Sequence, residues 1–361
     1  MTTKFYMPIL KSKAGEFSAL TNLSEPHKKR IVPLFDITNV DYDHEEAKIS
    51  KTIDEHLLGF CKKVIKYWPV NPMFIDTVLV NNEMVNGKSA LQFVFELLAV
   101  KNITPMPVVY PNSSNKHLDT IVLLKMLYPI ENIAIRLTVD HVYDPEFKNK
   151  IDKIISNLGI SPVDCHLIFD LKDSDFSQTE DFADGIIDVI GDFPYFNEWL
   201  TVTIAGGAFP TISKIKASPQ LVPRNDWKLY NILKTKISKT DFNRSLNFGD
   251  YSIVAPAFFE FNPKIMTTSA NIRYTLTDYW YVVKGRALKK SIDWQQFYDQ
   301  ANHIVRSKYY LGETYSHGDT HLKKCAAKAT TTGNASTWIA VGTNHHFTKV
   351  IKDLFSKTVL T

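Results

Sequence analysis

The chain has 361 residues, of which 44% are hydrophobic and 22% charged, with 14 glycines, 17 prolines and 3 cysteines. This composition is too apolar for a disordered chain and too poor in glycine for a fibrous one, and three cysteines exclude a disulfide framework. No apolar run is long enough to span a membrane and the first residues lack a secretory signal, so we expect a cytoplasmic protein without membrane contact.

Basic residues gather toward the C-terminal end. Residues 261–361 hold 14 Lys and Arg against 6 Asp and Glu, whereas the first 260 residues hold 28 against 32. A basic region on a mildly acidic body can attract a polyanion such as nucleic acid. Solvated surface lysines produce the same excess, and no stretch has the consecutive basic residues of a nucleic-acid-binding arm. Nucleic acid is therefore one candidate partner among several.

Eight short apolar runs, each typical of a strand buried on both faces, recur in the first 260 residues. They are Phe5–Leu10, Ile31–Ile37, Met73–Val78, Met106–Tyr110, Ile133–Leu137, His166–Leu171, Leu200–Ala205 and Ser252–Ala257. The stretches between them with helical character are Glu16–Leu23, Thr52–Tyr67, Ser89–Val100, Leu118–Leu127, Pro145–Leu158, Phe182–Ile190 and Asp226–Lys236. Helices between strands require crossover connections, so we expect a parallel sheet.

The number of strand–helix units predicts the α/β class and a closed, TIM-type (β/α)8 barrel over residues 1–260, because eight such units in about 250 residues are typical of that fold. The alternative is an open doubly wound sheet. That fold favours a glycine-rich turn after its first strand, and Lys11–Glu16 contains one glycine. We therefore predict the barrel.

The C-terminal residues 261–361 are predicted to form an α+β extension that packs on the barrel. Arg273–Val283 is rich in β-branched and aromatic residues, which indicates a strand or hairpin. Asp293–Lys308 has a helical apolar face, and Asn334–Phe355 contains a further helix. This region has too little apolar mass for an independent domain.

Four blocks of sequence carry a resemblance to a known family. The first holds Tyr6-Met-Pro-Ile-Leu-Lys11 and Ile31-Val-Pro-Leu-Phe-Asp36, the second runs from Pro223-Arg-Asn-Asp-Trp227 to Phe248-Gly-Asp-Tyr251, the third holds Ile272-Arg-Tyr-Thr275, and the fourth holds Gly333–Trp338 and Gly342-Thr-Asn-His-His346. Together they resemble the phage-type "beta protein" family of phages and bacterial accessory islands, over effectively the full length. The family has no settled activity, so the resemblance implies a fold and a phage–host setting, and no catalytic residues.

Polar residues follow the predicted strands, and in a (β/α)8 barrel the active site lies at the carboxyl ends of the strands. The catalytic candidates are Asp170, Asp36 and Lys11, and the ligand-binding candidates are Arg136, Asp76, Glu16, Lys172, Tyr251, Arg273 and His345. Carboxylates interleaved with cations suit a phosphorylated or other anionic small molecule, with or without a divalent metal. The cofactor stays unknown.

Several candidates also have a purely structural explanation. Asp36 and Asp170 lie inside apolar runs, so each is either at a pocket rim or paired with a cation. Arg136 needs an anion, which is either a ligand phosphate or Asp170. Lys11 could be a solvated loop residue, and Glu16 a carboxylate in the first turn of a helix.

Two glycine-containing motifs also leave alternatives open. Gly206-Gly207 either lets a phosphate approach backbone amides or makes a tight turn. His317 and His321 lie four residues apart, a spacing that can bind a metal on one helix face. Gly318 is expected to break a helix there, which argues against that metal site.

Three functions remain open. The first is a barrel enzyme that acts on a phosphorylated or nucleotide-like ligand. The second is a non-catalytic effector of phage–host conflict that binds a host or phage protein, or nucleic acid, through its basic C-terminal region. The third is an oligomeric structural component with an aromatic interface at Tyr279–Tyr281. Walker, Gly-x-Ser-x-Gly and dinucleotide motifs are absent from the sequence, and the oligomeric state is unknown.

Overall fold

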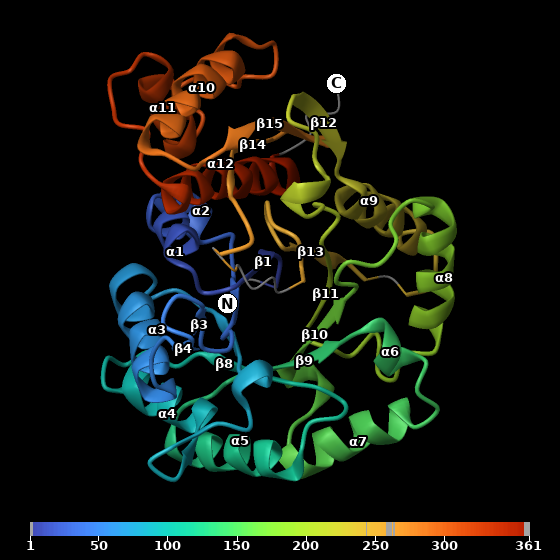
Figure 1. The fold of residues 1–361 in the computed structure, drawn as a ribbon. Coiled ribbons are helices and arrows are strands. Elements are labelled where there is room, and N and C mark those ends of the chain that lie inside the picture. The colour runs from blue at the N-terminus through green and yellow to red at the C-terminus, as the bar shows by residue number, and fades with distance from the viewer. Residues whose placement is uncertain (1–2, 243, 258–261, 263, 357–361) are drawn as a thin grey trace.

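A computed structural model describes residues 3–242, 244–257, 262 and 264–356. Its parallel strands close into a barrel in the order β1-β13-β11-β10-β9-β8-β5-β2. These strands are β1 (Tyr6–Leu10), β2 (Leu34–Asp36), β5 (Phe74–Asp76), β8 (Met106–Val109), β9 (Ile133–Leu137), β10 (Cys165–Asp170), β11 (Thr201–Gly206) and β13 (Leu246–Asp250). The predicted (β/α)8 barrel is confirmed, and the open sheet is wrong (Figure 1).

The eighth strand differs from its predicted position. It was expected at Ser252–Ala257, but the strand that pairs with β1 and β11 is β13, which ends at Asp250. Its sequence does not form an apolar run because Asn247 and Gly249 interrupt it. Gly249 allows close packing, since a Cβ there would lie 2.9 Å from the Ala205 Cβ and 3.0 Å from a β1 carbonyl oxygen.

A ring of helices surrounds the barrel (Figure 1). It consists of α1 (Ala14–Thr21), α3 (Ile53–Tyr67), α4 (Ala90–Ala99), α5 (Asn115–Leu127), α7 (Phe147–Leu158), α8 (Thr179–Gly191), α9 (Asn225–Ile237) and α12 (Ala335–Phe355). Helix α12 is separated from β13 by most of the extension, yet it packs against α1 and β1. The boundary expected between a barrel (residues 1–260) and an extension (residues 261–361) stays a prediction. Helix α12 lies beyond that boundary and still contributes to the ring.

Short elements decorate the connections. They are α2 (Glu25–Lys28), α6 (Val139–Val142), the hairpins β3 (Tyr42–Asp43) with β4 (Lys48–Ile49) and β6 (Met84–Val85) with β7 (Lys88–Ser89), and the 3-10 turns η1 (Val78–Val80), η2 (Pro162–Asp164), η3 (Ile212–Lys214) and η4 (Ser291–Gln295).

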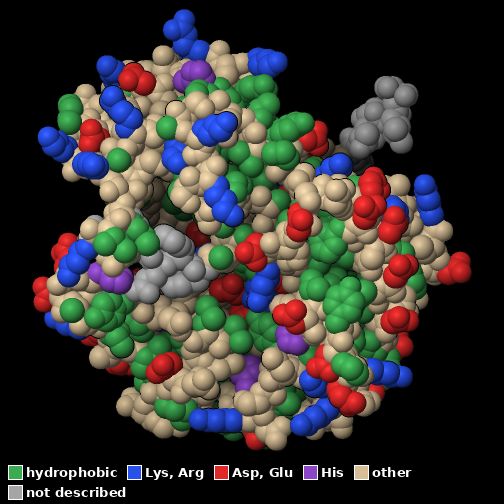
Figure 2. Space-filling view, turned by 45° about the vertical axis from the view of Figure 1, so that its right-hand side comes forward, with side chains coloured by type: hydrophobic (Ala, Val, Ile, Leu, Met, Phe, Trp, Pro, Cys, Tyr) green, Lys and Arg blue, Asp and Glu red, His purple; other side chains and the backbone are tan. Residues whose placement is uncertain are grey.

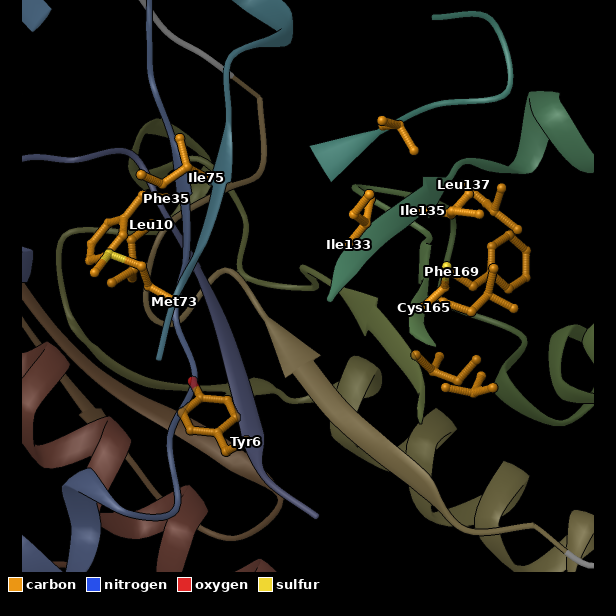
Figure 3. Packing of buried hydrophobic residues seen from close by; sticks show 14 of the residues in the cluster. Tyr6, Leu10, Phe35, Met73, Ile75, Ile133, Ile135, Leu137, Cys165 and Phe169 are labelled. Carbon is orange, nitrogen blue, oxygen red and sulfur yellow. The ribbon is translucent and has the colours of Figure 1, made fainter. Parts of the chain in front are cut away.

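Strand side chains alternate between two cores. Outward-facing residues such as Phe35, Ile135 and Phe169 pack against the helices, and Figure 3 shows them on opposite walls of the barrel. Inward-facing residues such as Leu34 and Ile168 fill the barrel interior. Full burial of one such apolar side chain contributes roughly 2 kcal/mol. Asp36 and Asp170 lie two positions after Leu34 and Ile168. Because of the same alternation, they point toward the barrel axis at the ends of their strands.

The extension is built on a three-stranded antiparallel sheet. Strands β14 (Ser269–Thr275) and β15 (Tyr279–Ala287) form the predicted hairpin, and β12 (Pro219–Pro223), from the connection between β11 and α9, joins β15. Helix α10 (Gln296–Arg306) confirms the helix expected over Asp293–Lys308, apart from its first turn, which is the 3-10 turn η4. The expected extension packed on the barrel is therefore present.

Helix α11 (His317–Ala326) was not predicted, and the expectation that Gly318 breaks a helix there is wrong. Ser316 caps the helix by accepting the Asp319 N–H at 3.1 Å. A Cβ at Gly318 would lie 2.3 Å from the carbonyl oxygen of Val341 on α12. The glycine therefore allows α11 to pack closely on α12.

Two expectations about the surface can be compared with the structure. No helix within the described residues combines the length and apolar character needed to cross a bilayer. The expectation that the aromatic residues at Tyr279–Tyr281 are exposed is wrong for Trp280 and Tyr281, which are buried, whereas Tyr279 is 42% exposed.

Candidate functional site

Four predicted residues meet where the barrel strands end. Arg136 on β9 donates from Nη1 to Asp36 Oδ1 at 2.6 Å and to Asp76 Oδ2 at 2.8 Å. Its Nε and Nη2 donate to Asp170 Oδ2 at 3.1 and 2.6 Å. The register of β2 and β5 places Asp36 directly beside Asp76. Side chains from positions 36 to 170 of the chain thus form one network around a guanidinium.

Two tyrosines complete this network, and one of them, Tyr251, is the fifth predicted site residue that it contains. Tyr110 donates its hydroxyl to Asp76 Oδ2 at 2.5 Å. Tyr251 donates to Asp170 Oδ2 at 2.7 Å and accepts from Arg136 Nη2 at 3.0 Å. All five guanidinium N–H groups of Arg136 therefore have an acceptor. We call this set the mouth cluster; it consists of Asp36, Asp76, Tyr110, Arg136, Asp170 and Tyr251.

The carboxyl groups of the mouth cluster differ in exposure and in charge. The side chains of Asp76 and Asp170 are 1% and 0% exposed, whereas that of Asp36 is 17% exposed. Burial raises the pKa of Asp36 to about 6; Arg136 opposes this shift, and the neighbouring Asp76 adds to it. Burial alone would lower the pKa of Arg136, but the surrounding carboxylates, led by Asp36, raise it. Arg136 therefore stays charged, and Asp36 titrates near neutral pH.

Lys11 and Lys172 also lie at strand ends, outside the mouth cluster. Lys11 Nζ donates to the carbonyl oxygens of Ala255 and Ala257 at 2.9 and 2.7 Å, and burial lowers its pKa. Lys172 is exposed and has a positive φ of 48°. Its N–H donates to Asp170 Oδ1 at 3.0 Å, and its ammonium group has no partner within the described chain. Lys172 is thus a free cation beside the mouth cluster.

Glu16 and Arg273 do not join the mouth cluster. Glu16 is in the first turn of α1, where its carboxylate accepts the backbone N–H groups of Lys11 and Lys13 at 3.2 and 2.9 Å. Arg273 lies on β14 and donates from Nη1 to the Ile253 carbonyl oxygen at 2.6 Å. Both side chains organise backbone segments in the contacts that the structure shows.

The Gly206-Gly207 pair makes close packing possible. A Cβ at Gly207 would lie 2.3 Å from Pro256 Cγ, and one at Gly206 would lie 2.8 Å from Phe176 Cζ. The Gly207 N–H is already bonded to the Lys172 carbonyl oxygen at 2.7 Å. A phosphate approaching these glycines would therefore meet side chains and an occupied amide.

His141 is a residue near the mouth that sequence reasoning missed. Its Nδ1 accepts the Thr138 N–H at 3.0 Å, so the neutral ring carries its proton on Nε2. Its ring centroid is 6.0 Å from that of Tyr110. Burial, and then Lys172, lower the pKa of His141. It lies on α6, four residues after the end of β9, and so does not follow its strand directly as the predicted site residues do.

A second buried network lies between the barrel and the extension. His346 on α12 contacts Asp250 Oδ2 through Nε2 at 2.8 Å and Thr275 Oγ1 through Nδ1 at 2.9 Å. The Tyr6 hydroxyl donates to Asp250 Oδ1 at 2.5 Å. Burial alone would raise the pKa of Asp250, but His346 and Tyr6 outweigh it and lower that pKa.

His345 forms a parallel arrangement on the extension side of α12. Its Nδ1 contacts Asp319 Oδ2 at 2.8 Å, and its ring stacks on Tyr274 with centroids 3.9 Å apart. Tyr274 donates its hydroxyl to Asp319 Oδ1 at 2.7 Å. Burial alone would raise the pKa of Asp319, but the contacts, His345 first, lower it. We call the combined network the seam; it consists of Tyr6, Asp250, Tyr274, Thr275, Asp319, His345 and His346.

The seam contains residues from the four blocks that carry the family resemblance, apart from Asp319. Sequence reasoning considered His345 or His346 for a pocket role and proposed His345 as a ligand-binding residue, whereas the structure places both in the seam, fully buried. For the other seam residues except Asp319, the signal in the sequence was that they belong to these blocks.

The strand ends and the pair His317 and His321 are the two places where the sequence suggests a divalent metal. In the described part of the chain, no group of three or more His, Cys, Asp or Glu side chains is placed to hold a metal ion. The carboxylates of the mouth cluster surround a guanidinium, and Asp319 contacts His345 rather than His317 or His321. These donor sets do not fit a metal in their present arrangement.

The closed barrel and the charged network at its strand ends define the class: this is a (β/α)8-barrel protein with a polar cluster built at the barrel mouth. The Beta protein family model matches residues 6–352, so the chain belongs to the Beta protein family. The resemblance predicted from the four blocks is confirmed. No curated protein matches the chain.

Proposed function

We propose that the mouth cluster is an acid–base site acting on a small anionic molecule, phosphorylated or nucleotide-like, and that Asp36 transfers the proton. The observation that carries this proposal is the state of Asp36. It is the most exposed of the three carboxyls, its Oδ2 has no hydrogen bond within the described chain, and burial raises its pKa to about 6. A general acid or base works best when its pKa lies near the ambient pH.

The other residues take supporting roles in this proposal. Arg136 orients Asp36 rather than binding the ligand, because none of its N–H groups is left free. Lys172, with its free ammonium group, and the Nε2–H of His141 bind the anionic group of the ligand. Lys11 holds the segment at residues 255–257 beside the mouth.

The test compares wild-type protein with Asp36→Asn against a panel of nucleoside monophosphates, nucleoside triphosphates and sugar phosphates, with products detected by mass spectrometry. We expect the wild type to convert one panel compound and Asp36→Asn to convert it about 100-fold more slowly or less. Asp188→Asn, an exposed position on α8, is the matched control and should equal the wild type. Equal turnover by Asp36→Asn, or no conversion by the wild type, would contradict the proposal.

We further infer that this activity serves phage–host conflict, the setting that the family resemblance implies. Host cells expressing wild-type protein or Asp36→Asn would be infected with phage and plaques counted. A difference between wild type and empty vector that disappears in Asp36→Asn supports the inference. If Asp36→Asn changes the plaque count as strongly as the wild type does, the biological effect does not depend on the mouth cluster, and the inference is wrong.

A second candidate function is nucleic-acid binding by the extension. Exposed basic side chains gather on β15, α10, α11 and their connections, and Figure 2 shows several on the part of the molecule that projects at the top. We call this set the basic lobe; it consists of Arg286, Lys289, Lys290, Arg306, Lys308, Lys323, Lys324 and Lys328. Backbone phosphates are recognised by such clusters, and binding then weakens steeply with salt.

Filter binding to a DNA duplex and to single-stranded RNA, each at two salt concentrations, tests this candidate. The quadruple charge reversal of Lys289, Lys290, Lys323 and Lys324 to Glu should abolish salt-sensitive binding, whereas Asp36→Asn should leave it unchanged. Binding that survives the charge reversal would rule out the basic lobe as the nucleic-acid site.

A further inference from the structure

We propose that His346 is a positioning residue for the mouth cluster: through Asp250, it holds the backbone that places Tyr251 against Asp170 and Arg136. The inference rests on the proposed function of the mouth cluster, but it concerns a different element, helix α12. It links the seam to the mouth cluster through two adjacent residues of the chain.

The first step is the geometry at the end of β13. Asp250 and Tyr251 are neighbours, and their side chains point to opposite sides of the barrel wall. Asp250 faces outward and contacts His346 and Tyr6. Tyr251 faces inward and contacts Asp170 and Arg136. A displacement of the Asp250 carboxylate therefore acts on the backbone one residue away from the Tyr251 side chain.

The second step is that Asp250 holds the backbone on both sides of Tyr251. Its Oδ1 accepts the Ser252 N–H at 2.8 Å in addition to the Tyr6 hydroxyl. Ser252 has a φ of 60°, a left-handed conformation that is unfavourable for a non-glycine residue. The bond from Ser252 to Asp250 opposes relaxation of this turn. Tyr251 thus lies between two residues whose positions depend on one carboxylate.

The third step is that His346 has one defined hydrogen-bonding state. The contacts of Asp250 lower its pKa, so it is ionised, and its Oδ2 accepts a hydrogen bond from the Nε2–H of His346. Nδ1 then accepts from the Thr275 hydroxyl on β14. Burial lowers the pKa of His346, in agreement with a neutral ring. The histidine is therefore held from the extension and in turn holds Asp250.

His345 supplies a matched control within the same helix. It is as buried as His346 and makes the same kind of pair with a buried carboxylate, that of Asp319. Asp319, however, lies on α11, and no residue next to it belongs to the mouth cluster. His345 Nε2 also contacts the Thr275 carbonyl oxygen at 2.8 Å, so removing His345 leaves the Thr275 hydroxyl, His346 and Asp250 in place while it removes a buried His–Asp pair.

The experiment measures hydrogen exchange of the Arg136 side-chain N–H groups by NMR in full-length protein labelled with ¹⁵N-arginine. These signals are assigned by their absence in Arg136→Lys. Tyr251→Phe removes the hydroxyl that accepts from Arg136 Nη2. We expect the Arg136 N–H groups to exchange about tenfold faster in this variant, which corresponds to the loss of one hydrogen bond. His346→Leu should reproduce this faster exchange, and His345→Leu should stay within about twofold of the wild type.

His346→Gln provides a rescue, because its side-chain amide can donate to Asp250 from a position close to that of Nε2; wild-type exchange is expected. If His346→Leu fails to fold, Thr275→Val replaces it, since this change removes only the hydroxyl that holds Nδ1, and a smaller increase in exchange is expected. The proposal is overturned by unchanged Arg136 exchange in the His346 or Thr275 variant, or by an equal change in His345→Leu. The exchange measurement does not depend on turnover, which is what Asp36→Asn tests. Failure of this inference and failure of the proposed function can therefore be distinguished.

Discussion

The mouth cluster and the seam are both buried networks of carboxylates, and they differ in how many partners each carboxylate has. In the mouth cluster three carboxylates share the single cation Arg136. In the seam, Asp250 and Asp319 each have a histidine and a tyrosine of their own. The pKa of Asp36 is raised, with burial as the main cause, whereas the pKa values of Asp250 and Asp319 are lowered by their contacts. Burial alone does not decide the direction.

This difference separates a region that can change its charge from one that cannot. A carboxyl with a raised pKa destabilises the folded state when it is ionised, and a carboxyl with a lowered pKa stabilises it. Asp36 therefore costs stability at neutral pH while remaining able to exchange a proton. Asp250 and Asp319 contribute stability and keep their charge. Proteins often accept such a cost at functional sites.

The largest expected effect comes from removing the shared cation. Arg136→Met leaves Asp76 and Asp170 buried without a counter-charge, so we expect the free energy of unfolding to fall by about 3–5 kcal/mol, or folding to fail. Urea denaturation at pH 7.5 measures it. Arg273→Met is the control, because among the described residues Arg273 bonds to a carbonyl and an amide oxygen and lies over the Phe209 ring, and we expect a loss of about 1 kcal/mol. Equal losses would show that Arg136 does not hold the carboxylates together.

The next effect tests the seam. Asp319→Asn weakens the contacts to His345 and Tyr274, and we expect the free energy of unfolding at pH 7.5 to fall by about 2 kcal/mol. Because the folded-state pKa of Asp319 is lowered, its contribution is present above the unfolded pKa of about 3.8 and is lost as the pH falls through the folded pKa. The difference from wild type should therefore shrink in strong acid. A variant as stable as wild type at pH 7.5 would contradict the comparison.

Asp36→Asn should act in the opposite direction. The folded-state pKa of Asp36 is about 6 and its unfolded value about 3.8, so the folded state binds more protons between these values, and stability falls as the pH rises through that window. We expect Asp36→Asn to be more stable than wild type by roughly 3 kcal/mol at pH 7.5 and close to it near pH 4. Thermal unfolding across this pH range measures the difference. A less stable variant at pH 7.5 would show that the ionised pair with Arg136 is net favourable.

The smallest expected effect on stability is at the rim of the mouth. Lys172→Asn removes an exposed charge while keeping a residue that tolerates a positive φ, so the free energy of unfolding should change by less than about 0.5 kcal/mol. Binding of inorganic phosphate, measured by isothermal titration calorimetry, should weaken about tenfold, because one charge-assisted contact is lost. Unchanged phosphate binding would place the anion elsewhere.

Much of the mouth cluster could be predicted from the sequence because it depends on counting. Eight apolar runs with helices between them predict a parallel barrel, and the last inward-facing residue of each strand then reaches the mouth. This reasoning located Asp36, Asp76, Arg136 and Asp170, which the structure brings together. It placed the eighth strand wrongly, because Asn247 and Gly249 break the apolar run of β13.

The seam could not be found in that way. His346 and Asp250 are 96 positions apart, and β14, β15, α10 and α11 lie between them in the sequence. Gly318 was also expected to break a helix. It lies within α11 instead, because its lack of a side chain lets α11 pack closely on α12. Such contacts depend on which helix faces meet in three dimensions.

The sequence by itself determined the class of the fold and the direction of the polar residues at the strand ends, because strand alternation and parallel connections are local and repetitive. Only the tertiary structure decided which charges are paired. Within the described chain it left the Lys172 ammonium group without a partner, saturated Arg136 with three carboxylates and a tyrosine, and gave each seam carboxylate a histidine. Charge pairing depends on distances of a few ångströms between distant segments, and these distances are set only when the barrel closes and the extension packs against it.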